Sequence, residues 1–132
     1  MLKLKNISKK LGSFRLADIN MDIPAGTYYV LLGRSGSGKT QLLELIAGLN
    51  KPDSGEIWLG DENNTNKRIQ RRKVGLVFQD YAIFPNMTVL GNIAYSLTKG
   101  RYDRKTVRDQ VTRIASELNI LHLLDRSTQH LS

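Results

Sequence analysis

The sequence predicts an α/β fold, and three neighbouring features predict it. Residues 28–32 (Tyr-Tyr-Val-Leu-Leu) form a continuous apolar run, as expected of a strand buried on both faces. A glycine-rich loop follows at residues 33–40. Apolar residues then recur at helical spacing, at Leu42, Leu45, Ile46 and Leu49, and Gly48 is placed to end that helix. A strand, a glycine loop and a helix in this order indicate a strand joined to its helix through a ligand-binding turn.

The loop reads Gly33-Arg34-Ser35-Gly36-Ser37-Gly38-Lys39-Thr40 and fits the phosphate-binding pattern G-x-x-x-x-G-K-[ST] in full. Its glycines let backbone N–H groups surround phosphate oxygens, and the helix that follows points its positive end at the same anion. Lys39 adds a charge for the β- and γ-phosphates, and the Thr40 hydroxyl is a magnesium ligand. Gln41, next along the helix, completes the predicted binding segment. The pattern predicts a site for a nucleoside triphosphate.

Length and composition predict one globular domain. The chain has 132 residues, of which 40% are hydrophobic and 24% are charged, and it has no cysteine for disulfides or thiolate metal sites. No apolar run approaches the roughly 18–20 residues of a membrane-spanning helix. The net charge of +8 is spread over two regions, and solvated faces explain most of it, so no nucleic-acid partner is expected.

The N-terminal part alternates like paired strands. Residues 2–5 read as one strand and residues 14–23 as a second, with a change of side-chain parity that predicts a bulge near Ala17 and Asp18. These strands are expected to form an antiparallel layer beside the nucleotide core. Phe14 stands 25 positions before Lys39, where its ring could stack on a base or belong to the core, and both readings stay open.

Two further strands and two helices are predicted downstream. Residues 56–59 alternate as a short strand, and residues 74–78 form another apolar strand that ends directly before Gln79. Thr88 caps a helix whose apolar stripe comprises Val89, Ile93 and Leu97. A second amphipathic helix carries Val107, Val111, Ile114 and Leu118 and is closed by Asn119. Residues 120–125 read as a last helical turn or two.

These blocks together resemble the ATP-binding subunit of an ATP-binding-cassette (ABC) transporter, and the resemblance covers essentially the whole chain. It rests on the phosphate loop, the blocks at residues 45–49, 52–55, 74–79 and 83–85, and the helix that contains Asn92 and Ile93. The resemblance implies a P-loop NTPase fold of ABC type. It also implies that Gln79 is the catalytic Q-loop glutamine, whose amide oxygen reaches the magnesium ion and the attacking water. ATP and Mg²⁺ are the implied cofactors.

The resemblance also implies how the domain is divided. Residues 1–79 would be the β layer and phosphate-loop core, and residues 80–132 the start of a helical subdomain. Leu131 and Ser132 look like the start of the signature motif, which in the family caps the ATP held by the second subunit of a dimer. The chain would then be the N-terminal part of one ABC ATPase domain. Because the remaining catalytic motifs are not in this sequence, the 132-residue chain is expected not to turn over ATP by itself.

Two expectations concern ligand and partner. The family's adenine-stacking aromatic usually precedes a glycine in this region, but Leu11 precedes Gly12 here, which makes Phe14 the nearest substitute. The residues from Tyr81 to Leu97 would meet a membrane permease, which places the protein on the cytoplasmic face of the plasma membrane. The residues look most like those of molybdate/tungstate importers, although importers of other solutes share much of the pattern. A soluble ABC-type ATPase that acts on nucleic acid or ribosomes is the alternative.

Overall fold

The computed structural model describes residues 1–79, 82–100 and 102–131 of the chain. They form two compact units, Met1–Leu76 and Val77–Ser132. The division predicted after Gln79, between a nucleotide core and a helical subdomain, stays a proposal.

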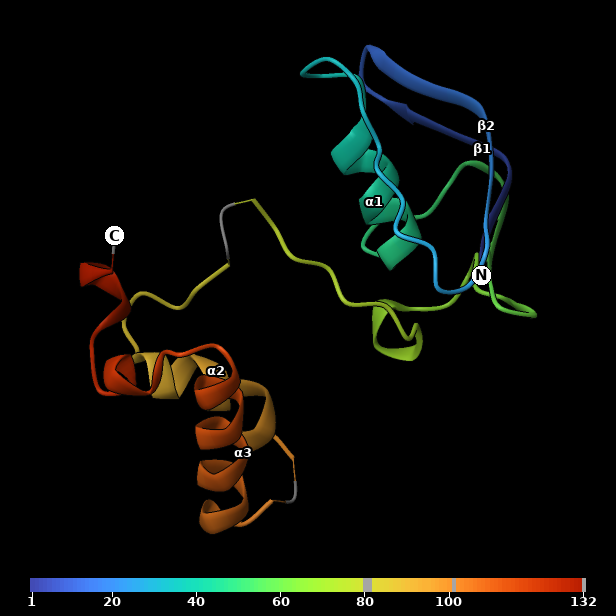
Figure 1. Cartoon of the computed structure of the whole chain (residues 1–132). Helices are drawn as coiled ribbons and strands as arrows, with labels where there is room; N and C mark the ends of the chain where they lie inside the picture. The colour runs from blue at the N-terminus through green and yellow to red at the C-terminus, as the bar shows by residue number, and fades with distance from the viewer. Residues whose placement is uncertain (80–81, 101, 132) are drawn as a thin grey trace. The chain divides into compact units, whose positions relative to one another are not determined.

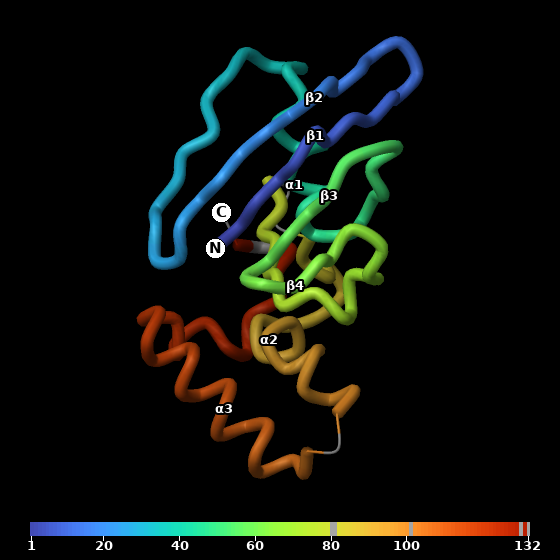
Figure 2. Tube along the Cα trace, turned by 90° about the vertical axis from the view of Figure 1, so that its right-hand side faces the viewer, coloured from blue at the N-terminus to red at the C-terminus, as the bar shows by residue number. Residues whose placement is uncertain are grey.

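The first unit is an antiparallel sheet with one helix against it. Its strands are β1 (Leu2–Leu11), β2 (Phe14–Ile23), β3 (Ser54–Leu59) and β4 (Glu62–Asn63), arranged in the order β2-β1-β3-β4. All three strand pairs are antiparallel, so the predicted antiparallel layer is confirmed. Helix α1 (Lys39–Ala47) lies along one face of the sheet (Figures 1 and 2).

The core of this unit joins the sheet to α1. The strands contribute Leu4, Ile7, Leu16 and Ile57, and the helix contributes Leu42, Leu45 and Ile46, all of them buried. Burial of one such side chain stabilises the fold by roughly 1.5–3 kcal/mol. Leu4 and Ile7 have opposite parity in β1, so both face α1 only because the strand is irregular between them. The core therefore fixes α1 on the sheet through side chains separated by a bulge.

Two bulges lie in the β1–β2 pair. The predicted one is confirmed: Ile7 pairs with Ile19 and Lys9 with Leu16, so Ala17 and Asp18 together oppose Ser8. The other was not predicted. Lys5 and Asn6 oppose Asn20, because Leu4 pairs with Met21 and the next pair is Ile7 with Ile19. Asn6 and Asp18 each have a positive φ, 50° and 51°, a conformation that Asn and Asp tolerate better than most residues.

Each bulge is held by a polar side chain from the opposite strand. The backbone N–H of Asp18 donates to Ser8 Oγ at 3.0 Å, and that of Asn6 donates to Asn20 Oδ1 at 2.9 Å. At the far end of β1, the Asp53 carboxylate accepts from Lys9 Nζ at 2.7 Å and from the Lys10 N–H at 2.8 Å. The hydrogen bond from Lys9 lowers the pKa of Asp53 below its ordinary value. These contacts fix the register of β1 against both neighbours.

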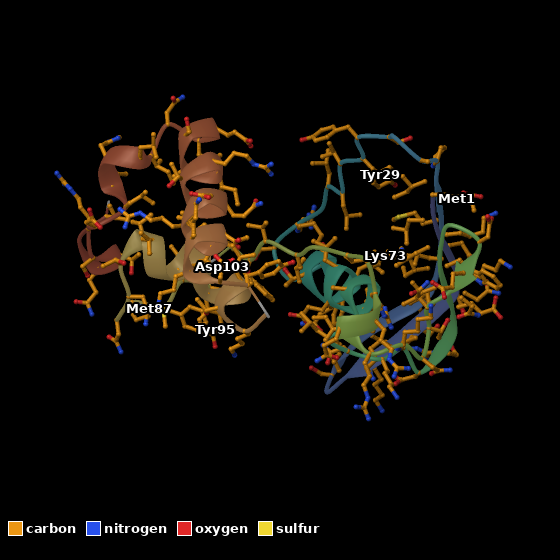
Figure 3. The ribbon with its side chains drawn as sticks, turned by 90° about the horizontal axis from the view of Figure 1, so that it is seen from below. Met1, Tyr29, Lys73, Met87, Tyr95 and Asp103 are labelled. Atoms are coloured by element: carbon orange, nitrogen blue, oxygen red, sulfur yellow. The ribbon has the colours of Figure 1, made fainter. Side chains whose placement is uncertain are left out.

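The strands predicted at residues 28–32 and 74–78 are wrong for this structure. Both segments lie outside every strand of the described residues, and Tyr28, Leu32 and Val77 are 92%, 85% and 88% exposed. A parallel strand needs a neighbour for its backbone N–H and C=O groups, and none of the described strands pairs with either segment. Tyr29 is labelled on the first of these segments in Figure 3. Only Leu31 packs against the core, so the apolar runs do not form a buried sheet here.

The second unit is a pair of helices, α2 (Val89–Thr98) and α3 (Arg104–Glu117) (Figure 1). Thr88 Oγ1 accepts from the Gly91 N–H at 3.1 Å and Asp103 Oδ1 from the Thr106 N–H at 2.8 Å. Caps of this kind are each worth about 1 kcal/mol. The bond from the Thr106 N–H lowers the pKa of Asp103. The predicted Thr88 cap is confirmed, and Asn119 has a positive φ of 57° directly after the end of α3.

The chain returns alongside α2 after α3. The predicted helical turns at residues 120–125 are a short 3₁₀ helix, η2 (Leu121–Leu123), followed by η3 (Thr128–His130). Between them the Val89 N–H donates to Arg126 O at 3.0 Å and the Leu90 N–H to Leu124 O at 2.9 Å. In the part of the chain that the structure describes, no helix is long and apolar enough to cross a membrane.

Candidate phosphate-binding site

The glycine loop leads directly into the first turn of α1. Gly38 is the N-cap of the helix with φ 89° and ψ 12°, in the left-handed region that favours glycine. Gly36 also has a positive φ, 77°. The Leu42 N–H donates to Gly38 O at 2.9 Å, so the helix begins at the loop itself. The N–H groups of the first turn have no partner within the helix and point toward the loop, where an anion is favoured.

Close contacts restrict two of these glycines. A Cβ on Gly38 would lie 2.6 Å from the Phe14 ring and 2.8 Å from Leu16 Cδ2. A Cβ on Gly33 would lie 2.7 Å from Ser37 Oγ. The loop therefore needs glycine at position 38 both for its backbone angles and for its packing on β2. This geometry positions the loop on the sheet and leaves its backbone N–H groups near the surface.

The side chain of Lys39 crosses the loop. Its Nζ donates to Gly33 O at 2.8 Å and to Arg34 O at 2.9 Å. The Ser37 N–H donates to Arg34 O at 3.2 Å, which closes the turn. One ammonium charge and several backbone N–H groups are thus gathered within a few residues, and this is the donor set of a phosphate site.

The other predicted binding residues lie in or next to the glycine loop, except Phe14, which comes from β2. Arg34, Ser35 and Thr40 are exposed, and Gln41 is half-buried in the first turn of α1. Phe14 is half-buried, packs against the core and touches Gly38. Its ring therefore lies beside the loop, and its stacking on a base stays a prediction. No group of three or more carboxylate or histidine side chains that could hold a metal by itself occurs among the described residues.

Gln79 belongs to the second unit, whereas the loop belongs to the first. Gln79 is exposed, in a turn after residues 73–78, which belong to no helix or strand. Its approach to a bound nucleotide and to magnesium stays a prediction. Tyr81 and Ser132, which are the start of the predicted permease-facing region and the end of the predicted signature motif, lie outside the described residues. Leu131 is exposed.

The described part of the permease-facing region contains a loop, residues 83–88, that we call the clamped loop. Asn92 Oδ1 accepts from the Phe84 N–H at 2.8 Å, and Asn92 Nδ2 donates to Phe84 O at 3.0 Å. Thr128 Oγ1 lies 3.0 Å from Phe84 O and 3.1 Å from Met87 O. The rings of Phe84 and Tyr95 have centroids 4.2 Å apart. Met87, in this loop, and Tyr95, in α2, are labelled in Figure 3.

Sequence reasoning missed the residues that hold these segments. Arg72 lies in one of the two charged regions that the sequence attributes mostly to solvated faces, yet its side chain is buried against the end of α1. Thr128 was given no role, yet its hydroxyl contacts carbonyl groups more than forty positions earlier in the chain. No local signal distinguishes either residue from its neighbours, because each partner lies far away in sequence. Asn92 could have been suspected, since a polar residue so early in an apolar helix often bonds to nearby backbone.

Comparisons with known proteins identify relatives of this chain. The family model described as "ABC transporter" matches residues 16–132. The molybdate/tungstate import ATP-binding protein WtpC of Pyrococcus horikoshii is 44% identical over 132 residues, which are 100% of this chain and 38% of that protein. The sulfate/thiosulfate import ATP-binding protein CysA of Mesostigma viride is 43% identical over 98% of this chain and 37% of that protein. The chain therefore spans well under half the length of these two relatives.

A solved structure has the same fold as this chain. The dimeric ATP-binding cassette MJ0796, bound to ADP and Pi in a post-hydrolysis state, matches with a TM-score of 0.84 and 29% identity. The match covers 100% of this chain and 63% of that one. The fold of the chain is therefore that of part of an ATP-binding cassette, as predicted.

Proposed function

Since the chain belongs to the ABC transporter family, we propose that it is the ATP-binding part of an importer subunit that couples ATP binding and hydrolysis to solute transport. The observation that carries this proposal is the glycine loop at the start of α1, with Lys39 Nζ held across it. A short loop of this kind is suited to the phosphates of ATP, because its backbone N–H groups and the ammonium charge are already gathered at the start of the helix.

The residues present fit both proposed cofactors. Gly36 and Gly38 give the loop its two left-handed residues, and Lys39 supplies the charge for the outer phosphates. The Thr40 hydroxyl, exposed in the first turn of α1, would hold Mg²⁺ together with Gln79. Bound Mg²⁺ would neutralise charge that develops on the phosphates. Gln79 would orient the attacking water in the intact protein.

The proposed partners are a second ATPase subunit and a membrane permease. The dimeric cassette among the solved structures supports the first partner. The permease would bind at the region from Tyr81 to Leu97, whose described part presents Ile83 and Phe84 with 49% and 40% of their surfaces exposed. Apolar groups so exposed on a hydrogen-bonded loop suit a protein contact. Such a partner would hold the subunit at the cytoplasmic face of the plasma membrane.

For the solute, we propose molybdate/tungstate or a similar oxyanion. The support is the WtpC relative, and the CysA relative is named for sulfate and thiosulfate, which are also oxyanions. Solute uptake by the intact transporter, measured with labelled molybdate, tungstate and sulfate in competition, distinguishes these solutes. Preference for a cation or a sugar would contradict the proposal.

Replacing Lys39 by alanine should reduce ATP binding by the chain below detection. The variant loses the only ammonium held across the loop in the described structure, while its neighbours keep the backbone in place. Titration with a fluorescent ATP analogue measures the loss. Lys51→Ala, which removes an exposed lysine after the end of α1, is the matched control and should bind as the unmodified chain does.

The same samples test turnover. The unmodified chain should release no phosphate above the level of Lys39→Ala, in line with the expectation from its sequence. Equal ATP affinity in the unmodified chain and in Lys39→Ala would contradict the proposed phosphate site. Phosphate release that disappears with Lys39→Ala would contradict the expectation that the chain has no turnover.

Replacing Phe14 by alanine should weaken ATP binding several-fold if its ring stacks on adenine. A stack of an aromatic side chain on a base is worth about 1–3 kcal/mol. Because the ring also packs on the core, the affinity must be measured on the folded fraction, by far-UV circular dichroism and titration together. Leu11→Ala, at the other end of the same β-hairpin turn, is the control. Equal affinity for ATP and for inorganic triphosphate, in the chain with Phe14 intact, would show that no base stack contributes.

A further inference from the structure

Arg72 is a buried cation whose partners are all backbone carbonyl groups. The residue is only 5% exposed. Nη1 donates to Leu45 O at 2.7 Å and to Ile46 O at 2.9 Å. Nε donates to Lys67 O and Nη2 to Thr65 O, both at 3.0 Å. No carboxylate forms an ion pair with it among the described residues. Burial lowers the pKa of the guanidinium, which nevertheless stays charged.

Two of these carbonyl groups belong to the last turn of α1. That turn carries no basic residue of its own, so Arg72 supplies the cation that favours the negative end of the helix. Gly48, the C-cap, has φ 88°, and a Cβ there would lie 2.5 Å from Arg72 Nε. The close approach of the guanidinium therefore depends on glycine at this position. The guanidinium of Arg72 therefore packs closely against the C-terminal end of α1.

The other end of α1 is the phosphate loop. The helix has nine residues, Lys39–Ala47, and is therefore only about 13 Å long. Over this length a helix moves as a rigid rod, so a shift along its axis at Ala47 is repeated at Gly38. Apolar packing of Leu42 and Leu45 holds the helix against the sheet without directional bonds. The bonds from Arg72 are directional, and two of them lie at the helix end.

We propose that Arg72 is a positioning residue for the phosphate loop: by holding the carbonyl end of α1 to residues 65–67, it sets where Gly38 and Lys39 meet a nucleotide. This inference rests on the proposed function, because it assigns the loop a nucleotide. It adds a residue from outside the phosphate-binding pattern to the binding machinery. Displacing reacting or binding groups by about 1 Å commonly costs large factors in affinity or rate.

The first test compares three variants. Arg72→Met keeps most of the side-chain volume and loses the charge and the hydrogen bonds, and its folded fraction should bind the fluorescent ATP analogue about tenfold more weakly. Arg72→Lys keeps a cation near the helix end and should bind more tightly than Arg72→Met. Arg71→Met, an exposed neighbour, should bind as the unmodified chain does. A purely structural role would lower the melting temperature and leave the affinity of the folded fraction unchanged, which would overturn the proposal.

The second test uses the unmodified chain and does not depend on the folding of a variant. The Arg72 Nε–H gives a ¹⁵N-coupled NMR signal, assigned by its absence from Arg72→Lys. Adding magnesium–ATP should shift this signal together with the amides of Gly36 and Gly38, and neither should shift in Lys39→Ala. If the loop amides shift and the Arg72 signal does not, the inference is wrong and the proposed function stands. If the loop amides do not shift either, the proposed function fails, and the inference with it.

Discussion

Replacing Gly55 by alanine should lower the free energy of unfolding of the first unit by about 3–5 kcal/mol. Gly55 has φ 93°, and a Cβ there would clash with Asn6 O and lie 2.5 Å from Lys5 O. Both oxygens are backbone atoms of the unpredicted bulge in β1, so they cannot move aside as the end of a flexible side chain would. The substitution must break either the β1–β3 pairing or the bulge.

Gly60→Ala is the matched control. Gly60 also has a positive φ, 61°, but a Cβ there would meet no atom within 4 Å, so only the backbone cost of about 1 kcal/mol remains. Denaturant unfolding monitored by the fluorescence of Trp58, the single tryptophan and a residue of β3, reports on this sheet. Equal losses for the two variants would show that contact with the bulge does not matter.

In the intact transporter, Ile83→Asp should abolish solute uptake and leave ATP binding unchanged. Ile83 is 49% exposed at the start of the clamped loop, so a charge there costs the folded subunit little. The loop is nevertheless held firmly, since Asn92 bonds to both backbone groups of Phe84. At the proposed contact with a permease, a charge on this side would be buried without a partner, which is strongly unfavourable. Uptake and nucleotide titration on the same preparation measure the two effects.

Leu118→Asp is the control for this prediction. Leu118 is 63% exposed in the same unit but lies at the end of α3, outside the region from Tyr81 to Leu97. It should leave uptake unchanged. Crosslinks from a cysteine introduced at Met87 should reach the permease. Normal uptake with Ile83→Asp, or crosslinks only from position 118, would show that the permease contacts another surface.

The parts that could be predicted from the sequence depend on local chemistry. The glycine loop and the helix that begins at Lys39 follow from glycines at fixed spacing, so neighbouring residues suffice to predict their conformation, while the binding of phosphate stays a prediction. The bulge at Ala17 and Asp18 shows in the alternation of β2, because a slip of one residue moves apolar side chains to the other face. Thr88 and Asn119 mark helix ends for equally local reasons.

The parts that could not be predicted depend on distant partners. Residues 28–32 have the composition of a buried strand, but composition does not supply the neighbour that a parallel strand must pair with. The bulge at Lys5 and Asn6 is invisible in β1 alone, because Asn20 and Gly55 determine it from other strands. Arg72 looks like its basic neighbours until the end of α1 is placed against it. In each case the deciding atoms lie on another segment.

The pairing of β1 with β3 also bears on the order in which the molecule assembles. Leu2 pairs with Leu59, and the Lys9–Asp53 ion pair closes the other end of the same ladder. The phosphate loop and α1 lie within the stretch of chain that this ladder encloses. Closing so long a stretch costs chain entropy before the sheet contacts repay it, whereas the β1–β2 hairpin closes over a short turn. We therefore expect the hairpin to form early, and the segment that carries the glycine loop and α1 to be enclosed only when β3 joins β1.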